Sequence, residues 1–462
     1  MIQNEYKQFL NKSDIIANDE SHRLKILKAV TTHEQKVGDM IKSQFCDWEQ
    51  ARRSAADIKN YALDHLPELL EEFEKKITKR GTKVLWARDK HEARQQFLKI
   101  VSTHQATKVV KSKSMTTEEI EFNELCQENG IEVLESDLGE LIVQLAGEKP
   151  YHLVTPAMHK SRAEIGELFQ KYLGAPATED AAELTMIARG YLRDAYITSD
   201  IGVTGANFII ADQGAIVMTE NEGNGRLTMS CPETHVVIVG IEKVLPRLSD
   251  LALFLPLLAT SGTGQQLTGY NSIIRGPRRK GESDGPLNMY VILLDNGRSE
   301  LYQKQLFRPA LGCIRCGSCL NACPVYRTIG GHTYHTTYQG PIGSVLTPQF
   351  RGMDQWSHLS YASSLCAACS SVCPVDINIH KLLLENRWEA YQTKQTGSFW
   401  KWGLNFWAWT MTSRFRLNCI SHFTRFIYRF FLLFLSNGKR KRIPELPAKT
   451  FTELWKIYEK QK

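Results

Sequence analysis

Apolar and polar positions alternate in two different ways along this chain, and the change between them marks a first boundary. Residues 1 to about 70 are rich in charged residues, and their apolar positions recur three and four apart, as in Met40, Ile41, Phe45 and Trp48. That spacing places apolar side chains on one face of a helix. We therefore predict a helical lead-in over residues 1–70.

From about Lys83 the pattern changes to short apolar runs separated by helical stretches. The predicted strands span residues 83–87, 108–110, 131–134 and 152–154, then a hairpin of 208–211 with 215–218, and finally 235–241 and 290–294. Between the second and third strands, Thr116 and Glu119 have the spacing of a helix capping box. Strands that alternate with helices favour a parallel or mixed sheet covered by helices, so we predict an α/β domain over residues 71–300.

Aromatic and basic residues crowd the C-terminal tail, residues 393–462. The residues concerned are Trp402, Phe406, Trp407, Trp409, Phe415, Phe423, Phe426, Phe430 and Phe431, with Arg414, Arg416, Arg425 and Arg429 among them. The longest uncharged windows, 402–413 and 430–438, are far shorter than the ~18 to 20 apolar residues that cross a bilayer. We predict helices with one apolar and one cationic side, which would pack against partner subunits or dock on an anionic inner membrane surface. Partner packing is favoured, because soluble complexes bury aromatic and Arg-rich surfaces in the same way.

Composition places the chain among globular proteins with two or three domains. It has 462 residues, of which 42% are hydrophobic and 23% charged, and this excludes disordered, collagen-like and small disulfide-scaffold classes. The net charge of +7 is concentrated, since residues 390–444 hold ten Lys or Arg and no Asp or Glu. The first residues, MIQNEYKQFL, do not resemble a secretory signal, so we expect a cytoplasmic, reducing environment in which the cysteines are not paired as disulfides.

Seven of the eleven cysteines fall within residues 313–373 and form two related motifs. Cys313, Cys316, Cys319 and Cys323, followed by Pro324, have the spacing C-x2-C-x2-C-x3-C-P, in which three thiolates of one loop bind one iron-sulfur cubane and the fourth binds another. The second motif, Cys366, Cys369 and Cys373 before Pro374, lacks its first cysteine, and Ser363 stands in that place. A zinc site is the weaker alternative, because it would normally split its ligands into two distant pairs.

Crossed ligation follows if these motifs behave as in two-cluster ferredoxins. The first cluster would then be held by Cys313, Cys316, Cys319 and Cys373, and the second by Cys323, Cys366 and Cys369. The second site has three thiolates, so either its fourth iron takes a different ligand, such as Ser363, water or substrate, or it holds a 3Fe-4S cluster. The long gap between the motifs predicts an α-helical two-cluster ferredoxin-like domain, residues 301–392. A nucleic-acid partner is not expected for such a redox chain.

The order of these parts resembles the lactate utilisation protein B family. The resemblance is carried by CIRCGSCLNACPVY, GGHTYHTTYQGPIGSVLTP and SLCAACSSVCPVDI, preceded by an α/β segment and followed by a basic aromatic tail. It implies an N-terminal lactate-utilisation (LUD) domain with a fold similar to CoA transferases and ribose-phosphate isomerases. It also implies two 4Fe-4S clusters and two partner subunits, a cysteine-rich redox subunit and a second LUD-domain protein.

The function that the resemblance implies is electron transfer in a multiprotein system that oxidises L-lactate to pyruvate. Glycolate or another 2-hydroxy acid is an alternative substrate, and a redox-sensing, metabolite-binding regulator is an alternative class. Glu222 is a candidate nucleophile by fold analogy, because a glutamate in a comparable loop is the nucleophile of CoA transferases; the alternative is a solvated loop residue.

Other residues offer less specific chemistry. The loop of Lys111 and Lys113 would suit an anion, or would simply be a solvated basic loop. His152 and His159 are candidate proton carriers, with packing as the alternative. Gly331 and His332 belong to a stretch that would either contact a substrate or partner or only shape its loop. Residues 260–265 lack the end of a phosphate-binding P-loop, and the chain has no dinucleotide fingerprint after a strand, so ATP hydrolysis and a Rossmann-bound NAD or flavin are not predicted.

Overall fold

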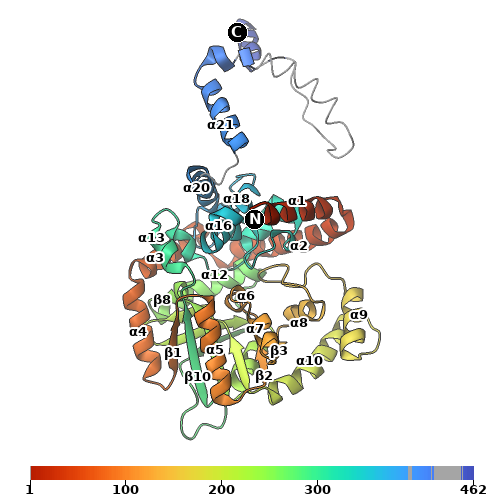
Figure 1. Cartoon of the computed structure of the whole chain (residues 1–462), viewed down its shortest axis with the longest axis vertical. Coiled ribbons are helices and arrows are strands. Elements are labelled where there is room, and N and C mark those ends of the chain that lie inside the picture. The colour runs from red at the N-terminus through yellow and green to blue at the C-terminus, as the bar shows by residue number, and fades with distance from the viewer. Residues whose placement is uncertain (1, 394–397, 418, 421–448, 450, 462) are drawn as a thin grey trace. The chain divides into compact units, whose positions relative to one another are not determined.

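The computed structural model describes residues 2–393, 398–417, 419–420, 449 and 451–461, and the chain divides into two compact units, residues 1–390 and 391–462 (Figure 1). The strands are β1 (Lys83–Ala87), β2 (Lys108–Lys111), β3 (Glu132–Glu135), β4 (Ile201–Thr204), β5 (Phe208–Ile210), β6 (Ala215–Glu220), β7 (Thr234–Gly240), β8 (Val244–Leu245), β9 (Tyr270–Ile274) and β10 (Asn288–Leu294).

Helices fill most of the remaining described chain. Before the cysteine motifs lie α1 (Ile2–Asn18), α2 (Glu20–Gln44), α3 (Trp48–Asp64), α4 (Leu66–Thr78), α5 (Lys90–His104), α6 (Met115–Glu119), α7 (Phe122–Glu128), α8 (Leu138–Leu145), α9 (Arg162–Leu173), α10 (Ala181–Thr198), α11 (Asn224–Ser230), η1 (Ile241–Lys243), η2 (Leu248–Asp250), α12 (Leu251–Thr263) and α13 (Arg298–Gln303). From there on lie η3 (Arg308–Gly312), α14 (Ser318–Ala322), α15 (Pro324–Ile329), η4 (His332–Tyr334), α16 (Gly340–Arg351), α17 (Met353–Trp356), α18 (His358–Tyr361), α19 (Ala368–Ser371), α20 (Ile379–Gln392), α21 (Ser398–Met411) and α23 (Phe451–Gln461).

A six-stranded sheet with the order β1-β10-β7-β4-β2-β3 forms the centre of the α/β part, and every neighbouring pair in it is parallel. Its central strands are buried on both faces, which is typical of parallel sheets covered by helices. The prediction of a mixed α/β architecture with a parallel sheet is confirmed.

A second sheet, with the order β8-β5-β6-β9, connects the α/β part to the cysteine-containing part. The predicted hairpin is confirmed, since β5 and β6 pair antiparallel. Alternating side chains lie on opposite faces of this sheet. Ile209 and Ile216 pack toward the parallel sheet, whereas Phe208 and Ile210 pack into the core that contains the cysteines. Phe254 of α12 contacts Phe208 with ring centroids 5.4 Å apart.

The N-terminal helices pack against the cysteine-containing part, although more than 250 residues separate α2 from Cys313 in the chain. Ile26 and Val30 of α2 are buried in the same core as Cys316 and Cys373. Figure 1 shows α1 and α2, in red, beside α16 and α18, with α12 between this group of helices and the sheets. The helical lead-in therefore completes the core around the cysteines.

Two local predictions are wrong for reasons of tertiary structure. Residues 152–154 form bends and no strand, because side chains satisfy the neighbouring backbone: Tyr326 donates to the Tyr151 carbonyl at 2.8 Å, and Lys113 donates to the Val154 carbonyl at 2.5 Å.

The second concerns the predicted capping box at Thr116. The helix α6 begins after Ser114, whose hydroxyl accepts the amide of Thr117 at 3.3 Å. The carboxylate of Glu119 is held by Arg298, a stronger partner than a backbone amide.

The second unit contains α21 and α23. On α21 the rings of Trp402, Phe406 and Trp409 stack in succession, and these side chains are 44 to 64% exposed. Arg414 and Arg416 follow α21, and the Arg416 guanidinium lies over the ring of Trp409, 4.5 Å from its centroid. The predicted tail residues Phe423, Arg425, Phe426, Arg429, Phe430 and Phe431 lie outside the described residues. Within the described part of the chain, no helix is long and apolar enough to cross a membrane.

Candidate iron-sulfur centre

The two cysteine loops share a pair of positive φ angles around one cysteine. In the first, Arg315 and Gly317 flank Cys316 with φ values of 61° and 81°; in the second, Leu365 and Ala367 flank Cys366 with φ values of 54° and 66°. Positive φ is uncommon for residues other than glycine. The repeat places Ser363 in the position of Cys313. Its hydroxyl accepts the amide of Leu365 at 3.1 Å.

The seven thiols fall into two groups, and within each group the charges of the thiols interact. Burial and then its neighbours Cys313, Cys316 and Cys373 raise the pKa of Cys319. Burial and then the neighbours Cys323 and Cys366 raise the pKa of Cys369 to about 11. The assignment of these thiols to two clusters by crossed ligation stays a prediction.

The two groups differ in their exposure to solvent. Cys316, Cys319 and Cys373 are buried and Cys313 is half-buried, whereas Cys366 of the second group is exposed. Arg52 of α3 holds the second loop, because its guanidinium donates to the carbonyls of Cys373 at 2.7 Å and Ser370 at 3.0 Å. Cys366 is thus the one cysteine of the two motifs at the surface, since Cys323 and Cys369 of its group are buried.

Buried positive charge surrounds Cys313. Lys59, Lys243 and Arg315 are among its charged neighbours, and all three are at least nine-tenths buried. Burial, followed by the charge of its cationic neighbour, lowers the pKa of Lys59 to about 7 and that of Lys243 to about 8.

The carboxylates nearby do not balance this charge. Arg298 adds a fourth cation, against the two buried carboxylates of Glu119 and Glu242. Both Arg315 Nη atoms are buried and have no hydrogen-bond partner. Buried charge needs a counter-charge, and an iron-sulfur cluster held by four thiolates supplies a negative one, so the pocket fits the predicted group.

The C-terminal end of α12 supports the first cysteine loop. Ser318 donates to the carbonyl of Ser261 at 2.6 Å, and His33 of α2 binds the carbonyl of Gly262 at 2.9 Å. The ring of His152 lies against Gly317, at whose position a Cβ atom would approach the ring to 3.2 Å. Burial lowers the pKa of His152 to about 3, and its Nδ1 accepts backbone amides, so His152 has a structural role.

The loop after β2 does not present free cations. Lys111 is fully buried, and its ammonium group contacts Glu135 at 2.7 Å and Glu118 at 3.1 Å. Lys113 donates to the backbone of the 148–160 segment. The prediction of an anion site in this loop is therefore not supported for Lys111.

Glu222 lies in the loop between β6 and α11. Its Oε2 accepts the amide of Leu138, at the start of α8, at 3.1 Å. The residue as a whole is exposed, but partial desolvation of the carboxylate, followed by the charge of Asp137, raises its pKa to about 7. Glu222 can therefore exchange a proton near neutral pH.

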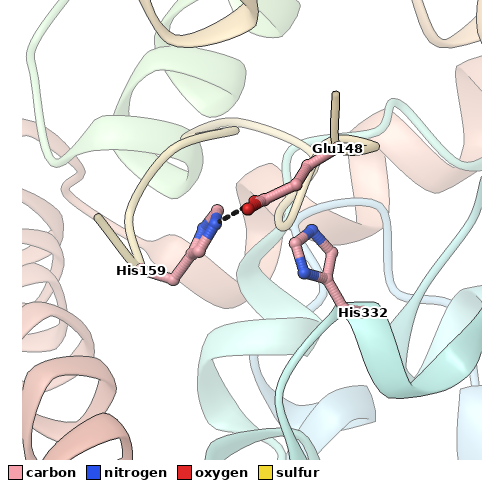
Figure 2. A group of neighbouring side chains, drawn as sticks. All are labelled: Glu148, His159 and His332. Carbon is pink, nitrogen blue, oxygen red and sulfur yellow. Dashed lines mark hydrogen bonds and ion pairs between the residues drawn. The ribbon is translucent and has the colours of Figure 1, made fainter. Parts of the chain in front are cut away.

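Glu148, His159 and His332 converge from two distant segments (Figure 2). One possible ligand atom from each lies within 4.8 Å of the other two. Sequence reasoning singled out His159 and His332 separately. It missed their meeting, because no local pattern joins residues so far apart in the chain.

Comparison with known proteins agrees with this arrangement. The chain matches the LUD domain family over residues 70–294 and the 4Fe-4S dicluster domain family over residues 309–377. It therefore contains a ferredoxin-like domain of the iron-sulfur-binding kind after the α/β part. A crystal structure of a DUF162 family protein from Deinococcus radiodurans covers 50% of this chain and 98% of its own, with 15% identity and a TM-score of 0.28, which is too low to support a fold comparison.

Several relatives are similar over most of their length. Lactate utilization protein B of Anoxybacillus flavithermus is 43% identical over 342 residues, which are 74% of this chain and 72% of that protein. Lactate utilization protein B of Bacillus velezensis is 44% identical, with the same coverage. The uncharacterized electron transport protein YkgF of Escherichia coli is 41% identical over 363 residues, 78% of this chain and 76% of that protein. With its motifs, its two matched domains and these relatives, the chain belongs to the lactate utilisation protein B family.

Proposed function

We propose that this chain is the iron-sulfur electron-transfer subunit of a multiprotein system that oxidises L-lactate to pyruvate. The observation that carries the proposal is the sorting of seven cysteines into two neighbouring groups, in loops of repeated conformation. The names of the relatives, which refer to lactate utilisation and electron transport, support the substrate and the role.

The proposed cofactors are two 4Fe-4S clusters, which supply one-electron oxidation and reduction when bound. Cys313, Cys316, Cys319 and Cys373 would hold the first, and Cys323, Cys366 and Cys369 the second, whose fourth ligand is not a cysteine. Buried residues around the first group exclude water, and Lys59, Lys243 and Arg315 offset negative charge. Because Cys366 is exposed, we expect partner proteins to exchange electrons with the second cluster.

The proposed domain limits are a helical lead-in (1–70), an α/β domain (71–300), a ferredoxin-like domain (301–392) and a tail (393–462). We propose for the α/β domain a fold similar to CoA transferases and ribose-phosphate isomerases. The proposed partners are a cysteine-rich redox subunit and a second LUD-domain protein. The exposed aromatic rings of α21 support packing of the tail against such partners, with docking on a membrane surface as the alternative.

Electron flow from substrate tests the proposal. In the anaerobic complex with its partner subunits, L-lactate should produce the same reduced-cluster EPR signal as dithionite, within the time of one turnover. Glycolate at the same concentration serves as the matched comparison, and a faster response to glycolate would reassign the substrate. A signal that dithionite produces and neither acid produces would contradict an electron-transfer role in 2-hydroxy acid oxidation and favour a sensor.

For the α/β domain we propose Glu222 as a group that moves a proton during turnover, supported by its pKa near neutrality and its contact with the start of α8. Glu222→Gln should lower the rate of lactate-dependent reduction by about 10²-fold or more and leave dithionite reduction unchanged. The control is Glu233→Gln, at an exposed glutamate before β7. An unchanged rate in Glu222→Gln would make Glu222 an ordinary loop residue.

A further inference from the structure

We propose that Glu148, His159 and His332 form a mononuclear binding site for a divalent first-row transition-metal ion, separate from the cysteine groups. Glu148 and His159 lie in the irregular segment between α8 and α9, and His332 begins η4, between the two cysteine motifs. The inference does not depend on the proposed function.

The three side chains point toward one another across the boundary between these segments (Figure 2). Their possible ligand atoms lie within 4.8 Å of one another, and Glu148 Oε2 lies 2.7 Å from His159 Nε2. Two ligands of one zinc ion span at most about 4.2 Å, twice a zinc-ligand bond. Small side-chain rotations therefore suffice to bring all three atoms onto one ion.

Hydrogen bonds around the group orient it as in known metal sites. His332 Nε2 donates to the Lys149 carbonyl at 2.7 Å, which leaves Nδ1 of that ring free to coordinate. Lys160 binds the other carboxylate oxygen of Glu148, Oε1, and so fixes the carboxylate without occupying Oε2. The His159 side chain is 8% exposed, and its Nδ1 is buried without a hydrogen-bond partner.

Tyr151 holds both imidazole rings in position. Its ring stacks on His159, with centroids 4.7 Å apart and planes 21° apart, and it meets His332 edge to face at 4.9 Å. The close approach of the His332 loop requires Gly330 and Gly331. A Cβ atom on Gly331 would lie 1.7 Å from the Tyr151 carbonyl oxygen, and one on Gly330 would lie 1.9 Å from the Tyr151 hydroxyl. The loop is thus built to bring His332 to this point.

The donor set suits a transition metal. Imidazole nitrogens and a carboxylate oxygen are donors that zinc and ferrous iron both accept. Two imidazoles and one carboxylate leave open positions on zinc or ferrous iron. Glu148 also lines a cavity of about 240 Å³ beside α7 and α8.

Zinc titration of the full chain tests the site. The probe is Zn²⁺ added to anaerobically purified, tag-free protein whose clusters are in place, so that the cluster cysteines are not free to bind it. The wild type should bind one equivalent of Zn²⁺, and His332→Ala and Glu148→Gln should weaken that affinity on the order of 100-fold or more. Absence of the equivalent in the wild type, or unchanged affinity in both variants, would overturn the proposal.

Two comparisons keep the result specific to this site. His91→Ala removes an exposed histidine on α5 and should leave zinc affinity unchanged. Iron content and the reduced EPR spectrum report whether each variant still folds around its clusters. If His332→Ala loses iron, Glu148→Gln decides, because it keeps the side-chain shape and changes only the charge and donor type. Failure of zinc binding with intact cluster spectra would leave the proposed electron-transfer function standing.

Discussion

Replacing Cys316 by alanine is expected to remove one iron-sulfur cluster and leave the other. Because the thiol of Cys316 belongs to the group of Cys313, Cys319 and Cys373, the iron content should fall from about eight to about four per chain. Cys369→Ala should cause the same loss of iron through the other group. Iron and sulfide analysis with EPR of the dithionite-reduced protein measures both effects.

The two variants should retain different spectra, since each keeps the cluster that the other loses. Cys231→Ala is the matched control, because Cys231 is an exposed cysteine outside the motifs, and it should retain the wild-type iron content. If Cys316→Ala and Cys369→Ala left the same residual spectrum, the crossed ligand sets would be wrong. About seven irons in the wild type, with an oxidised 3Fe-4S signal, would instead revise the second cluster.

Arg298→Met is expected to destabilise the protein by about 3–5 kcal/mol, because it removes the cation paired with the buried carboxylate of Glu119 and one of the cations beside the buried carboxylate of Glu242. Arg298 is 1% exposed and binds Glu119 through both Nη atoms at 2.8 Å and Glu242 through Nε at 2.5 Å. Tyr338 of the cysteine-containing part donates to the same Glu119 carboxylate at 2.6 Å. The arginine therefore joins three segments of the α/β part and, through Tyr338, the ferredoxin-like part.

Urea unfolding under anaerobic conditions, followed by tryptophan fluorescence, measures the effect as a lower midpoint. Lys25→Met is the control: it removes a half-exposed ion pair with Glu164 at 3.2 Å, and the expected change is about 0–1 kcal/mol. Equal midpoints for Arg298→Met and Lys25→Met would contradict this account.

Stability should also depend on pH through Glu242. Although burial opposes ionisation, Arg298 and its cationic neighbours hold the pKa of Glu242 at about 2. The stabilisation from a depressed carboxyl pKa is present above its ordinary pKa and declines as pH falls toward 2.

Local patterns predicted the elements of the α/β part well. The runs at 83–87, 108–110 and 290–294 became β1, β2 and β10. In β2 and β10, consecutive buried β-branched and aliphatic residues fit a sheet covered on both faces, whereas β1 is a partly exposed edge strand. The run at 152–154 has the same character and forms no strand. Side chains from the cysteine-containing part hydrogen-bond to the neighbouring backbone. These side chains lie far along the chain, so a local stretch of sequence does not reveal them.

The cysteine spacing indicated which residues are candidate cluster ligands, and the assignment of each thiol to one of two clusters stays a prediction. The spacing contained no information about Lys59, which comes from α3, or about the meeting of His159 with His332. Both depend on contacts between segments far apart in the chain, and such contacts leave no periodic trace in the sequence.

The packing of α1, α2 and α3 against the cysteine loops also affects how the chain is made. These helices are synthesised before the cysteine loops. Arg52 therefore cannot bind the carbonyl of Cys373, and Ile26 and Val30 cannot be buried in the core around the cysteines, until those later residues are present. Contacts with such large sequence separation carry a large loop-closure entropy cost and slow folding. Burial of the N-terminal helices therefore requires the cysteine loops to be in place, and until then a nascent chain keeps the apolar faces of these helices exposed.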